Sequence, residues 1–288
     1  MNLINMLMKL IDYKIINNYW ITLESSIEKP RFCNSLVSIE YSDFLKYFTK
    51  TEELKNLIDK VYKGDVFVVK NAFKKNFINQ IKIDFDQFTR EQESSFHKMK
   101  EGCPDFHRVI DENVSNLYSI KALKHSAYFF PWNSDKYKLF PVINEKWRYL
   151  KLLGGRKFKE FENNTPKDGI VDRIQVLKYP PGGGLELHSD PYHNQRTFIS
   201  IYMSKRGEEY KSGGFYVIDS NKNKLDMEKL IDIGDLGFGY ATIMHGVDTI
   251  DGVDNCNWNT KNGRWFIGLY SNDSDEKENR LTSKQAKY

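Results

Sequence analysis

The pattern of hydrophobic and polar positions along the chain changes near residue 170. Before that point, apolar residues recur at three- and four-residue intervals over residues 40–62 and 73–90, which predicts two amphipathic helices. Between them, residues 65–71 form a short apolar run that is typical of a buried strand. After residue 170, short apolar runs alternate with glycine- and proline-containing turns, which predicts many strands. We therefore expect an α+β protein with a mainly β core and flanking helices, mostly N-terminal.

The same pattern divides the chain into three parts. Residues 1–64 are expected to form a helical elaboration that packs on the core. Residues 65–271 are expected to form a jelly roll, or double-stranded β-helix, because short strands separated by turns are typical of two facing sheets. Residues 91–169 are expected to form an insertion in this domain, with a helix near residues 115–125. Residues 272–288 are polar and charged, which predicts a disordered tail.

A candidate metal site lies at the end of one predicted strand. His188 and Asp190 are two positions apart, and residues two apart on a strand project from the same face of a sheet. With the distant His245 they provide two imidazoles and one carboxylate, the ligand set of the facial triad that holds non-haem Fe(II). A His-x-Asp triplet alone is a weak indicator, because most such pairs lie on a solvated surface.

The sequence around this triplet resembles the Fe(II)/2-oxoglutarate-dependent dioxygenases, most closely their prolyl-hydroxylase-like branch, over about residues 170 to 271. The similar blocks occur in the order found in that family: Gln175 to Gly182, His188-Ser-Asp190, Arg196 to Met203, Gly213 to Ile218, Gly234 to Gly237, His245-Gly-Val247 and Gly263-Arg264-Trp265. The resemblance implies a jelly-roll enzyme in which His188, Asp190 and His245 bind Fe(II). It also implies that the insertion over residues 91–169 forms a substrate lid. It further implies 2-oxoglutarate and O2 as co-substrates, with release of succinate and CO2.

Three further residues are candidates for binding 2-oxoglutarate. Arg264 could pair with the distal carboxylate, because a guanidinium offers planar, bidentate donors and stays protonated. The apolar run that follows Arg264 indicates a buried strand rather than a surface position. Tyr179 could donate a hydrogen bond from its hydroxyl to the co-substrate. The alternative is that Tyr179 is an ordinary strand tyrosine whose hydroxyl contacts water. Gln175 lies on the same strand face as Tyr179 and could reach the co-substrate through its amide.

Several neighbouring residues receive no assigned role. Tyr202 is one position out of the family's register, in which Met203 takes its place. His193 is expected in the loop after the metal strand, near a substrate. His107 and Arg108 could line a substrate pocket. The upstream histidines show no ligand spacing and are expected to be surface or hydrogen-bonded residues: His97, His107 and His125.

Composition narrows the classes of partner. The chain has 43 basic and 39 acidic residues, and its net charge of +4 is too small and too scattered to indicate nucleic acid. Its 3 cysteines are far apart and form no Cys-x-x-Cys pair, which favours a reducing, cytoplasmic location. The apolar N-terminal run is interrupted by Lys9 and Asp12 well short of a membrane span, so no membrane partner is expected.

We expect the enzyme to hydroxylate a C–H bond of a small polar metabolite or saccharide precursor. Desaturation and ring closure are alternative outcomes of the same chemistry, and a peptide or protein side chain is an alternative substrate. A cupin-like metal-dependent binding protein or isomerase without 2-oxoglutarate is a second class, which Arg264 and the Tyr179 block disfavour. An interaction module that has lost a metal ligand is a third, which the complete ligand set disfavours. No feature of the sequence indicates an oligomeric state.

Overall fold

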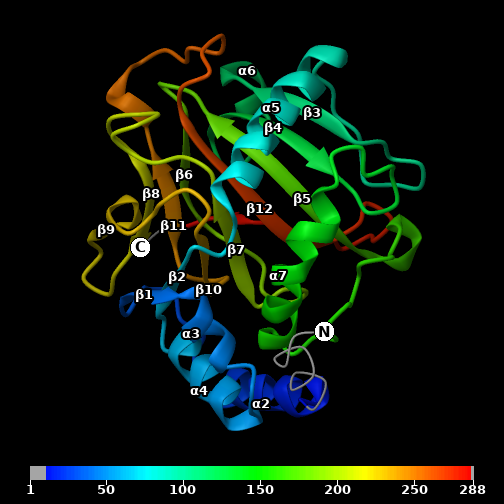
Figure 1. The fold of residues 1–288 in the computed structure, drawn as a ribbon, viewed down its shortest axis with the longest axis vertical. Coiled ribbons are helices and arrows are strands. Elements are labelled where there is room, and N and C mark those ends of the chain that lie inside the picture. Colours follow the sequence, from blue (N-terminus) through cyan, green and yellow to red (C-terminus); the bar gives the residue numbers. More distant parts are fainter. Residues whose placement is uncertain (1–10, 287–288) are drawn as a thin grey trace.

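Consecutive strands β5 to β12 build two facing sheets in the computed structural model, which describes residues 11–286 (Figure 1). Their bounds are Ile170–Tyr179 (β5), Gly184–Ser189 (β6), Thr197–Tyr202 (β7), Gly214–Ile218 (β8), Lys224–Asp226 (β9), Leu236–Tyr240 (β10), His245–Asp248 (β11) and Arg264–Asp273 (β12). One sheet has the order β5-β12-β7-β10 and the other β6-β11-β8-β9. Because successive strands mostly alternate between the two sheets, the expected double-stranded β-helix is confirmed.

Further strands extend both sheets. Strands β1 (Leu36–Glu40) and β2 (Val66–Lys70) continue the first sheet beyond β10. At its other end β4 (Ala122–Phe129) pairs with β5 and also with β6, so it joins the two sheets, and β3 (Phe106–Ile110) pairs with β4. The two-residue strand β13 (Lys284–Gln285) pairs with β6, the strand that carries His188.

Helices cover one end and one face of the first sheet. Their bounds are Tyr13–Ser26 (α2), Tyr41–Lys46 (α3), Thr51–Tyr62 (α4), Lys75–Glu91 (α5), Glu112–Ser115 (α6) and Leu139–Leu153 (α7), with short 3₁₀ helices at Pro166–Asp168 (η2), Met227–Lys229 (η3) and Ile250–Gly252 (η4). Helices α2, α3 and α4 lie together beyond β1 and β10, while α5 and α7 lie in front of β4, β5 and β12 (Figure 1). The ring of Phe85 on α5 packs edge-on against Trp265 on β12, at 5.1 Å between centroids.

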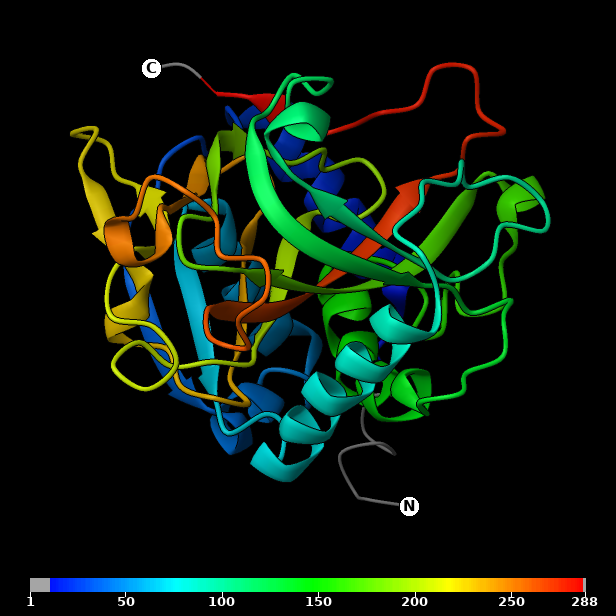
Figure 2. The ribbon, with the colours of Figure 1, turned by 90° about the horizontal axis from the view of Figure 1, so that it is seen from above.

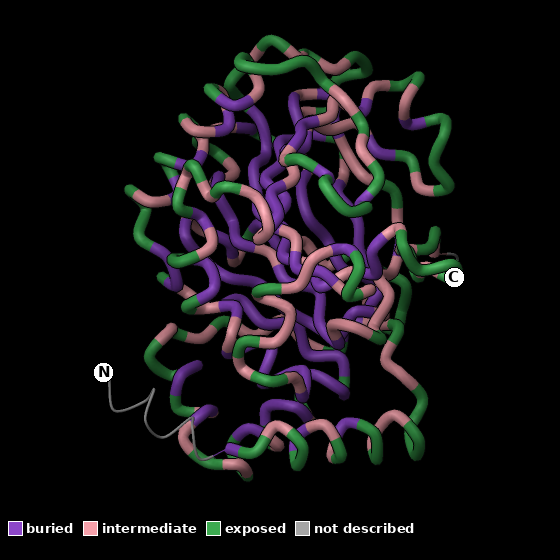
Figure 3. The backbone as a smooth tube through the Cα atoms, turned by 90° about the vertical axis from the view of Figure 1, so that its right-hand side faces the viewer, coloured by how far each residue is buried: buried purple, intermediate pink, exposed green. Residues whose placement is uncertain are grey.

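The core runs through both sheets and reaches the N-terminal helices, as the buried segments in Figure 3 show. Trp20 on α2 is fully buried, and its indole nitrogen donates a hydrogen bond of 2.6 Å to the carbonyl oxygen of Leu153. Residues 1–10 of the predicted N-terminal elaboration lie outside the described residues. Within residues 11–286, no helix is both long enough and apolar enough to cross a bilayer. All three cysteines are free.

The helix predicted near residues 115–125 is wrong. The structure has only the short α6 there, followed by β4 from Ala122 onward. Strand β4 pairs with β5 over Ser126 and its neighbours and with β6 at Ala122 and Leu123. Pairing with two strands that come later in the chain therefore overrides the local spacing, which carries no signal of that pairing.

The polar C-terminal segment also differs from the disordered tail expected over residues 272–288. Strand β12 continues to Asp273, whose carboxylate accepts the backbone N–H of Leu281 at 3.0 Å. Arg280 and Asp275 form an ion pair of 2.6 Å, and β13 follows (Figure 2). Hydrogen bonds and ion pairs hold this segment, so its lack of apolar residues did not indicate disorder.

Candidate active site

Strands β6 and β11 bring the predicted metal ligands together. His188 near the end of β6 and His245 at the start of β11 are directly paired, and Asp190 follows β6. One ligand atom from each of the three residues lies within 4.8 Å of the others. The Nε2 atom of His188 is 3.9 Å from Oδ1 of Asp190, and Nε2 of His245 is 3.7 Å from Oδ2. The arrangement is therefore a two-histidine, one-carboxylate cluster with converging donor atoms.

Backbone carbonyls fix both imidazoles in the same orientation. Nδ1 of His188 lies 2.9 Å from the carbonyl oxygen of Glu186, and Nδ1 of His245 lies 2.8 Å from that of Ile243. Because a carbonyl can only accept, each Nδ1 carries the hydrogen and each Nε2 keeps its lone pair. Those lone pairs are directed toward the carboxylate side of the cluster, as metal ligation requires.

The charges of the cluster also suit a metal ion. Burial, followed by the neighbouring His245, lowers the pKa of His188 to about 4, so its imidazole is neutral at neutral pH. Burial alone would raise the pKa of Asp190, but His245, His188 and the Ser283 hydroxyl outweigh it and hold this pKa below its ordinary value. A neutral imidazole and an ionised carboxylate are the ligand states that bind metal.

Ser283, in the C-terminal segment, was not predicted from the sequence. Its hydroxyl donates a hydrogen bond of 2.6 Å to Oδ1 of Asp190. The pairing of β13 with β6 places Lys284 opposite Ser189 and thereby holds Ser283 beside the cluster. Because the two residues are 93 positions apart and the segment of Ser283 is polar, no local sequence signal could have found this contact.

A cavity of about 410 Å³ opens beside the cluster. His188 and Asp190 line it from one sheet, and strands β4, β5 and β12 line it from the other. Its remaining wall comes from residues 96–130 and from residues 280–283 of the C-terminal segment. Aromatic side chains make up much of its apolar lining: Phe96, Phe106, Tyr118, Tyr128, Phe130, Phe198 and Tyr270.

The three predicted co-substrate residues lie at different depths. Gln175 lines the cavity, and its amide donates to the hydroxyl of Ser126 at 3.1 Å. Tyr179 and Arg264 are paired across β5 and β12 and are buried, and neither is among the residues that line the cavity. The Tyr179 hydroxyl has no hydrogen-bond partner among the described residues, so the hydrated tip considered for it is absent.

Arg264 is already paired with a carboxylate that the sequence did not predict. Its Nε donates to Oε1 of Glu228, in η3, at 2.6 Å. Glu228 also accepts from the hydroxyl of Tyr210 at 2.5 Å and from the backbone N–H of Phe215 at 2.7 Å. Both charged side chains are almost fully buried, at 3% and 1% exposure. The pair is therefore an internal, hydrogen-bonded salt bridge next to the Tyr179 hydroxyl.

Tyr202 belongs to the same cluster, although the register argument set it aside. Its ring centroid lies 5.9 Å from the guanidinium carbon of Arg264, and its buried hydroxyl has no partner among residues 11–286. Gly237 makes room for that hydroxyl, because a Cβ atom there would lie 2.1 Å from it. Gly237, in the Gly234 to Gly237 block, was thus the residue of the sequence that could have indicated a large side chain packed at this point.

The remaining histidines lie apart from the metal ligands. His107 and His125 hydrogen-bond each other at 2.9 Å, which confirms the interpretation of both as hydrogen-bonded residues; neither lines the cavity, and nor does Arg108. His97 lines the cavity, and its Nε2 lies 3.2 Å from the Ser95 hydroxyl, so it too is a hydrogen-bonded residue. His193 stacks on Tyr192 at 4.1 Å and is not among the cavity residues.

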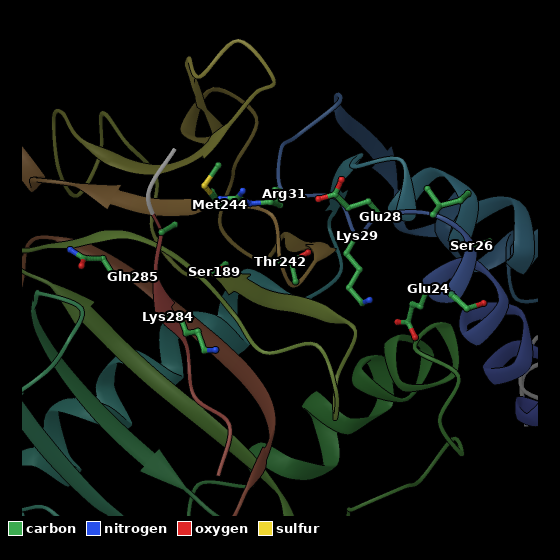
Figure 4. A pocket seen from close by; sticks show the side chains of 13 residues that line it. Glu24, Ser26, Glu28, Lys29, Arg31, Ser189, Thr242, Met244, Lys284 and Gln285 are labelled. Carbon is green, nitrogen blue, oxygen red and sulfur yellow. The ribbon is translucent and has the colours of Figure 1, made fainter. Parts of the chain in front are cut away.

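A second hollow, of about 640 Å³, lies between the end of α2 and β13 (Figure 4). Ser189 lines it, whereas His188 and Asp190 line the first cavity, as expected when neighbouring residues of a strand project to opposite faces. Its charged residues carry both signs, and one of them, Glu24, is paired with Arg196 at 2.8 Å. Among the described residues, this hollow contains no metal-ligand cluster.

Comparison with known proteins gives structural neighbours only. A full-length protein of Neurospora crassa, in complex with alpha-KG, has 13% sequence identity over 83% of this chain and 85% of its own, with a TM-score of 0.50. A prolyl-4-hydroxylase of Pseudomonas putida has 10% identity over 76% of this chain and 97% of its own, with a TM-score of 0.44. A Trichoplax adhaerens prolyl hydroxylase, in complex with a hypoxia inducible factor peptide fragment, has 12% identity over 79% and 94%, with a TM-score of 0.45. No family model and no curated protein matches the chain.

The likeness to the Neurospora crassa protein shows a shared fold. That fold and the cluster of His188, Asp190 and His245 are the two features that the resemblance to Fe(II)/2-oxoglutarate-dependent oxygenases implied. The similarity seen in the sequence is therefore supported both by the architecture and by the position of the ligands on β6 and β11.

Proposed function

We propose that this protein is an Fe(II)- and 2-oxoglutarate-dependent oxygenase that hydroxylates a small molecule. The observation that carries the proposal is the convergence of two Nε2 lone pairs and one carboxylate beside a cavity. Two nitrogen ligands and one oxygen ligand on one side of an ion suit Fe(II) and leave its other positions for exchangeable ligands. Bound Fe(II), with 2-oxoglutarate and O2, supplies the oxidising chemistry, and succinate and CO2 are its by-products.

The residues of the chain would hold and orient these groups. His188, Asp190 and His245 would bind the metal, while the carbonyls of Glu186 and Ile243 keep the imidazoles in the required tautomer. The hydrogen bond from Ser283 holds Asp190. Fixed ligands of this kind cost no rearrangement when the metal binds.

For the co-substrate we propose Arg264, Tyr179 and Gln175. Buried hydroxyls without partners are costly, and a ligand carboxylate would satisfy them. Such hydroxyls occur on Tyr179 and Tyr202, near Arg264, and on Thr197 at the cavity wall. A guanidinium has five N–H donors, so the bond from Nε to Glu228 leaves others for a carboxylate.

The segment of residues 91–169 is proposed as the part that determines the substrate. Side chains between Phe96 and Phe130 line the cavity together with the metal ligands His188 and Asp190. A cavity of about 410 Å³ suits a small polar metabolite or saccharide precursor. A peptide side chain that enters this cavity from outside is the alternative.

The first test is optical. The purified protein is mixed with Fe(II) and then 2-oxoglutarate without oxygen, and the weak visible charge-transfer band of the chelated keto acid is recorded. We expect the band in the wild type, its loss in His188→Ala and His245→Ala, and a steeply raised 2-oxoglutarate requirement with intact iron binding in Arg264→Leu. A protein that binds iron but gives no band would support the cupin-like alternative instead.

A further inference from the structure

Two basic side chains line the cavity without an acidic partner. They are Lys124 on β4 and Arg173 on β5. Within residues 11–286, neither side chain is ion-paired, and the ammonium of Lys124 makes no hydrogen bond. The buried Nε of Arg173 has no partner either, and one terminal nitrogen donates weakly to Gln175 at 3.2 Å. The fold thus partly buries two cations without neutralising them, which is unfavourable unless a ligand supplies the missing charge.

The two cations line one and the same cavity of about 410 Å³. Burial, and then the charge of Arg173, lowers the pKa of Lys124 to about 8, while the Asp190 carboxylate opposes this shift. Arg173 is held in place by aromatic rings, with its guanidinium carbon 4.8 Å from the ring centroid of Tyr270 and 5.4 Å from that of Tyr128. A rigid, unneutralised cation beside a second one is the arrangement expected where an anion binds.

The acids nearest the cavity are engaged elsewhere. Asp190 belongs to the metal cluster, and Asp275 is paired with Arg280 and also accepts the backbone N–H of Met99. The double positive charge of a divalent metal ion would be larger than the single negative charge of Asp190. The dicarboxylate co-substrate would then not suffice to neutralise the metal, Lys124 and Arg173 together.

Arg173 lies apart from Arg264, the residue proposed to hold the distal carboxylate of the co-substrate, although a terminal nitrogen of Arg173 contacts Gln175. Strands β5 and β12 pair Tyr179 with Arg264 at one end and Arg173 with Tyr270 further along. Residues 173 and 179 are six positions apart, which is about 20 Å at the rise of a strand. Arg264 is buried outside the lining of the cavity, whereas Lys124 and Arg173 line the cavity, so a co-substrate carboxylate held by Arg264 leaves the two cations for another ligand.

We propose that Lys124 and Arg173 form an anion subsite for the substrate, which therefore carries a carboxylate or phosphate group. This inference rests on the proposed function, because it assigns the other ligand of the same cavity. The two cations fix the anionic end, and the bond to be oxidised then lies between this end and the metal ligands.

Sulfate is a suitable probe, because it is an oxyanion that leaves Fe(II) in solution. The protein loaded with Fe(II) and 2-oxoglutarate under argon is titrated with sulfate in a calorimeter. We expect binding to the wild type and a dissociation constant raised at least about tenfold in Lys124→Met and in Arg173→Met. The matched control is Lys121→Met, because the Lys121 ammonium bonds to Asn116 and does not line the cavity. Arg173→Lys should retain part of the affinity, which separates loss of charge from loss of fold.

Equal sulfate affinity in the wild type and in both Met variants would overturn the subsite. So would competition between sulfate and 2-oxoglutarate with loss of 2-oxoglutarate binding in Arg173→Met, because the cations would then hold the co-substrate. Absence of the visible band in the wild type would refute the proposed function instead, and sulfate binding would still be measured on the same samples.

A turnover screen gives the second readout. Succinate release is compared between metabolites that carry a carboxylate or phosphate and their amides or unphosphorylated parents. We expect turnover only with the anionic member of a pair, and a KM raised at least about tenfold in Lys124→Met with a smaller change in kcat. Equal turnover of both members of a pair would contradict the subsite.

Discussion

The buried pair of Arg264 and Glu228 makes a prediction about stability that does not depend on the reaction. In Arg264→Met, the Glu228 carboxylate stays buried and retains only the hydrogen bonds from Tyr210 and Phe215. Removing one partner of a buried ion pair costs about 3–5 kcal/mol. We expect a loss of that size in the free energy of unfolding of Arg264→Met, and a similar loss in Glu228→Met, which leaves the guanidinium unpaired.

The double variant Arg264→Met/Glu228→Met separates pairing from packing. The double variant leaves no uncompensated charge. Its decrease in the free energy of unfolding should therefore be no larger than that of either single variant, and far below the sum of the two. The assay is urea unfolding of the metal-free protein, followed by tryptophan fluorescence, so that ligand binding does not add to stability. Losses that add to within about 0.5 kcal/mol would refute the argument, because the two charges would then be stabilised independently.

A partly exposed pair nearby provides the control. Arg206 contacts Asp226 at 2.7 Å, but the two side chains are 25% and 34% exposed. Exposed ion pairs typically contribute about 0–1 kcal/mol. Arg206→Met should therefore destabilise the protein far less than Arg264→Met in the same urea series.

Two further predictions concern Ser283 and His125. Ser283→Ala removes the hydrogen bond that helps to keep the pKa of Asp190 low, so metal affinity should fall by about tenfold. On acidification, metal should also be lost at a higher pH than in the wild type. A metal titration between pH 3 and pH 7 measures both effects, and unchanged affinity would contradict a positioning role. Burial, then the charges of His107 and Lys178, lowers the pKa of His125 to about 3, so the folded state keeps this imidazole neutral while the unfolded chain binds a proton below its ordinary value near 6.5. The contribution of His125 to the free energy of unfolding is therefore complete above pH 6.5. It should decrease as the pH is lowered below 6.5, by about 1.4 kcal/mol per pH unit. His125→Asn should reduce that slope in urea unfolding at pH 7 to pH 5, and an unchanged slope would assign it to other groups.

The metal ligands could be predicted from the sequence because their geometry is partly local. His188 and Asp190 are close along one strand, so the two-residue period alone places both side chains on one face. His245 is distant in sequence, and only the resemblance linked it to them before the pairing of β6 and β11 was known. The jelly roll was predictable for a related reason, since short strands between turns leave a visible pattern.

Residues that act through tertiary contacts could not be predicted in the same way. Glu228 accepts a hydrogen bond from Arg264, which lies 36 positions away in the sequence. Glu228 lies in a charged turn, whose sequence is like that of an ordinary surface turn. Ser283 meets Asp190 across 93 positions, from a segment too polar to indicate any packing. Neither position has a periodicity that would distinguish it from its neighbours.

Lys124 shows how an error in secondary structure hides a site. In the predicted helix of residues 115–125, Lys124 would be an ordinary solvated lysine. In β4, alternation places Lys124 on the same strand face as Ser126 and Tyr128, which pair with Leu177 and Gln175 of β5. Lys124 therefore lines the cavity that Arg173 also lines. The chemistry of the metal is thus encoded in a short motif, whereas the charge that would select the substrate arises only when a later strand pairs with β4. Variants of Lys124 therefore test both the observed pairing and the proposed specificity, because a helical Lys124 at the surface would leave sulfate binding unchanged.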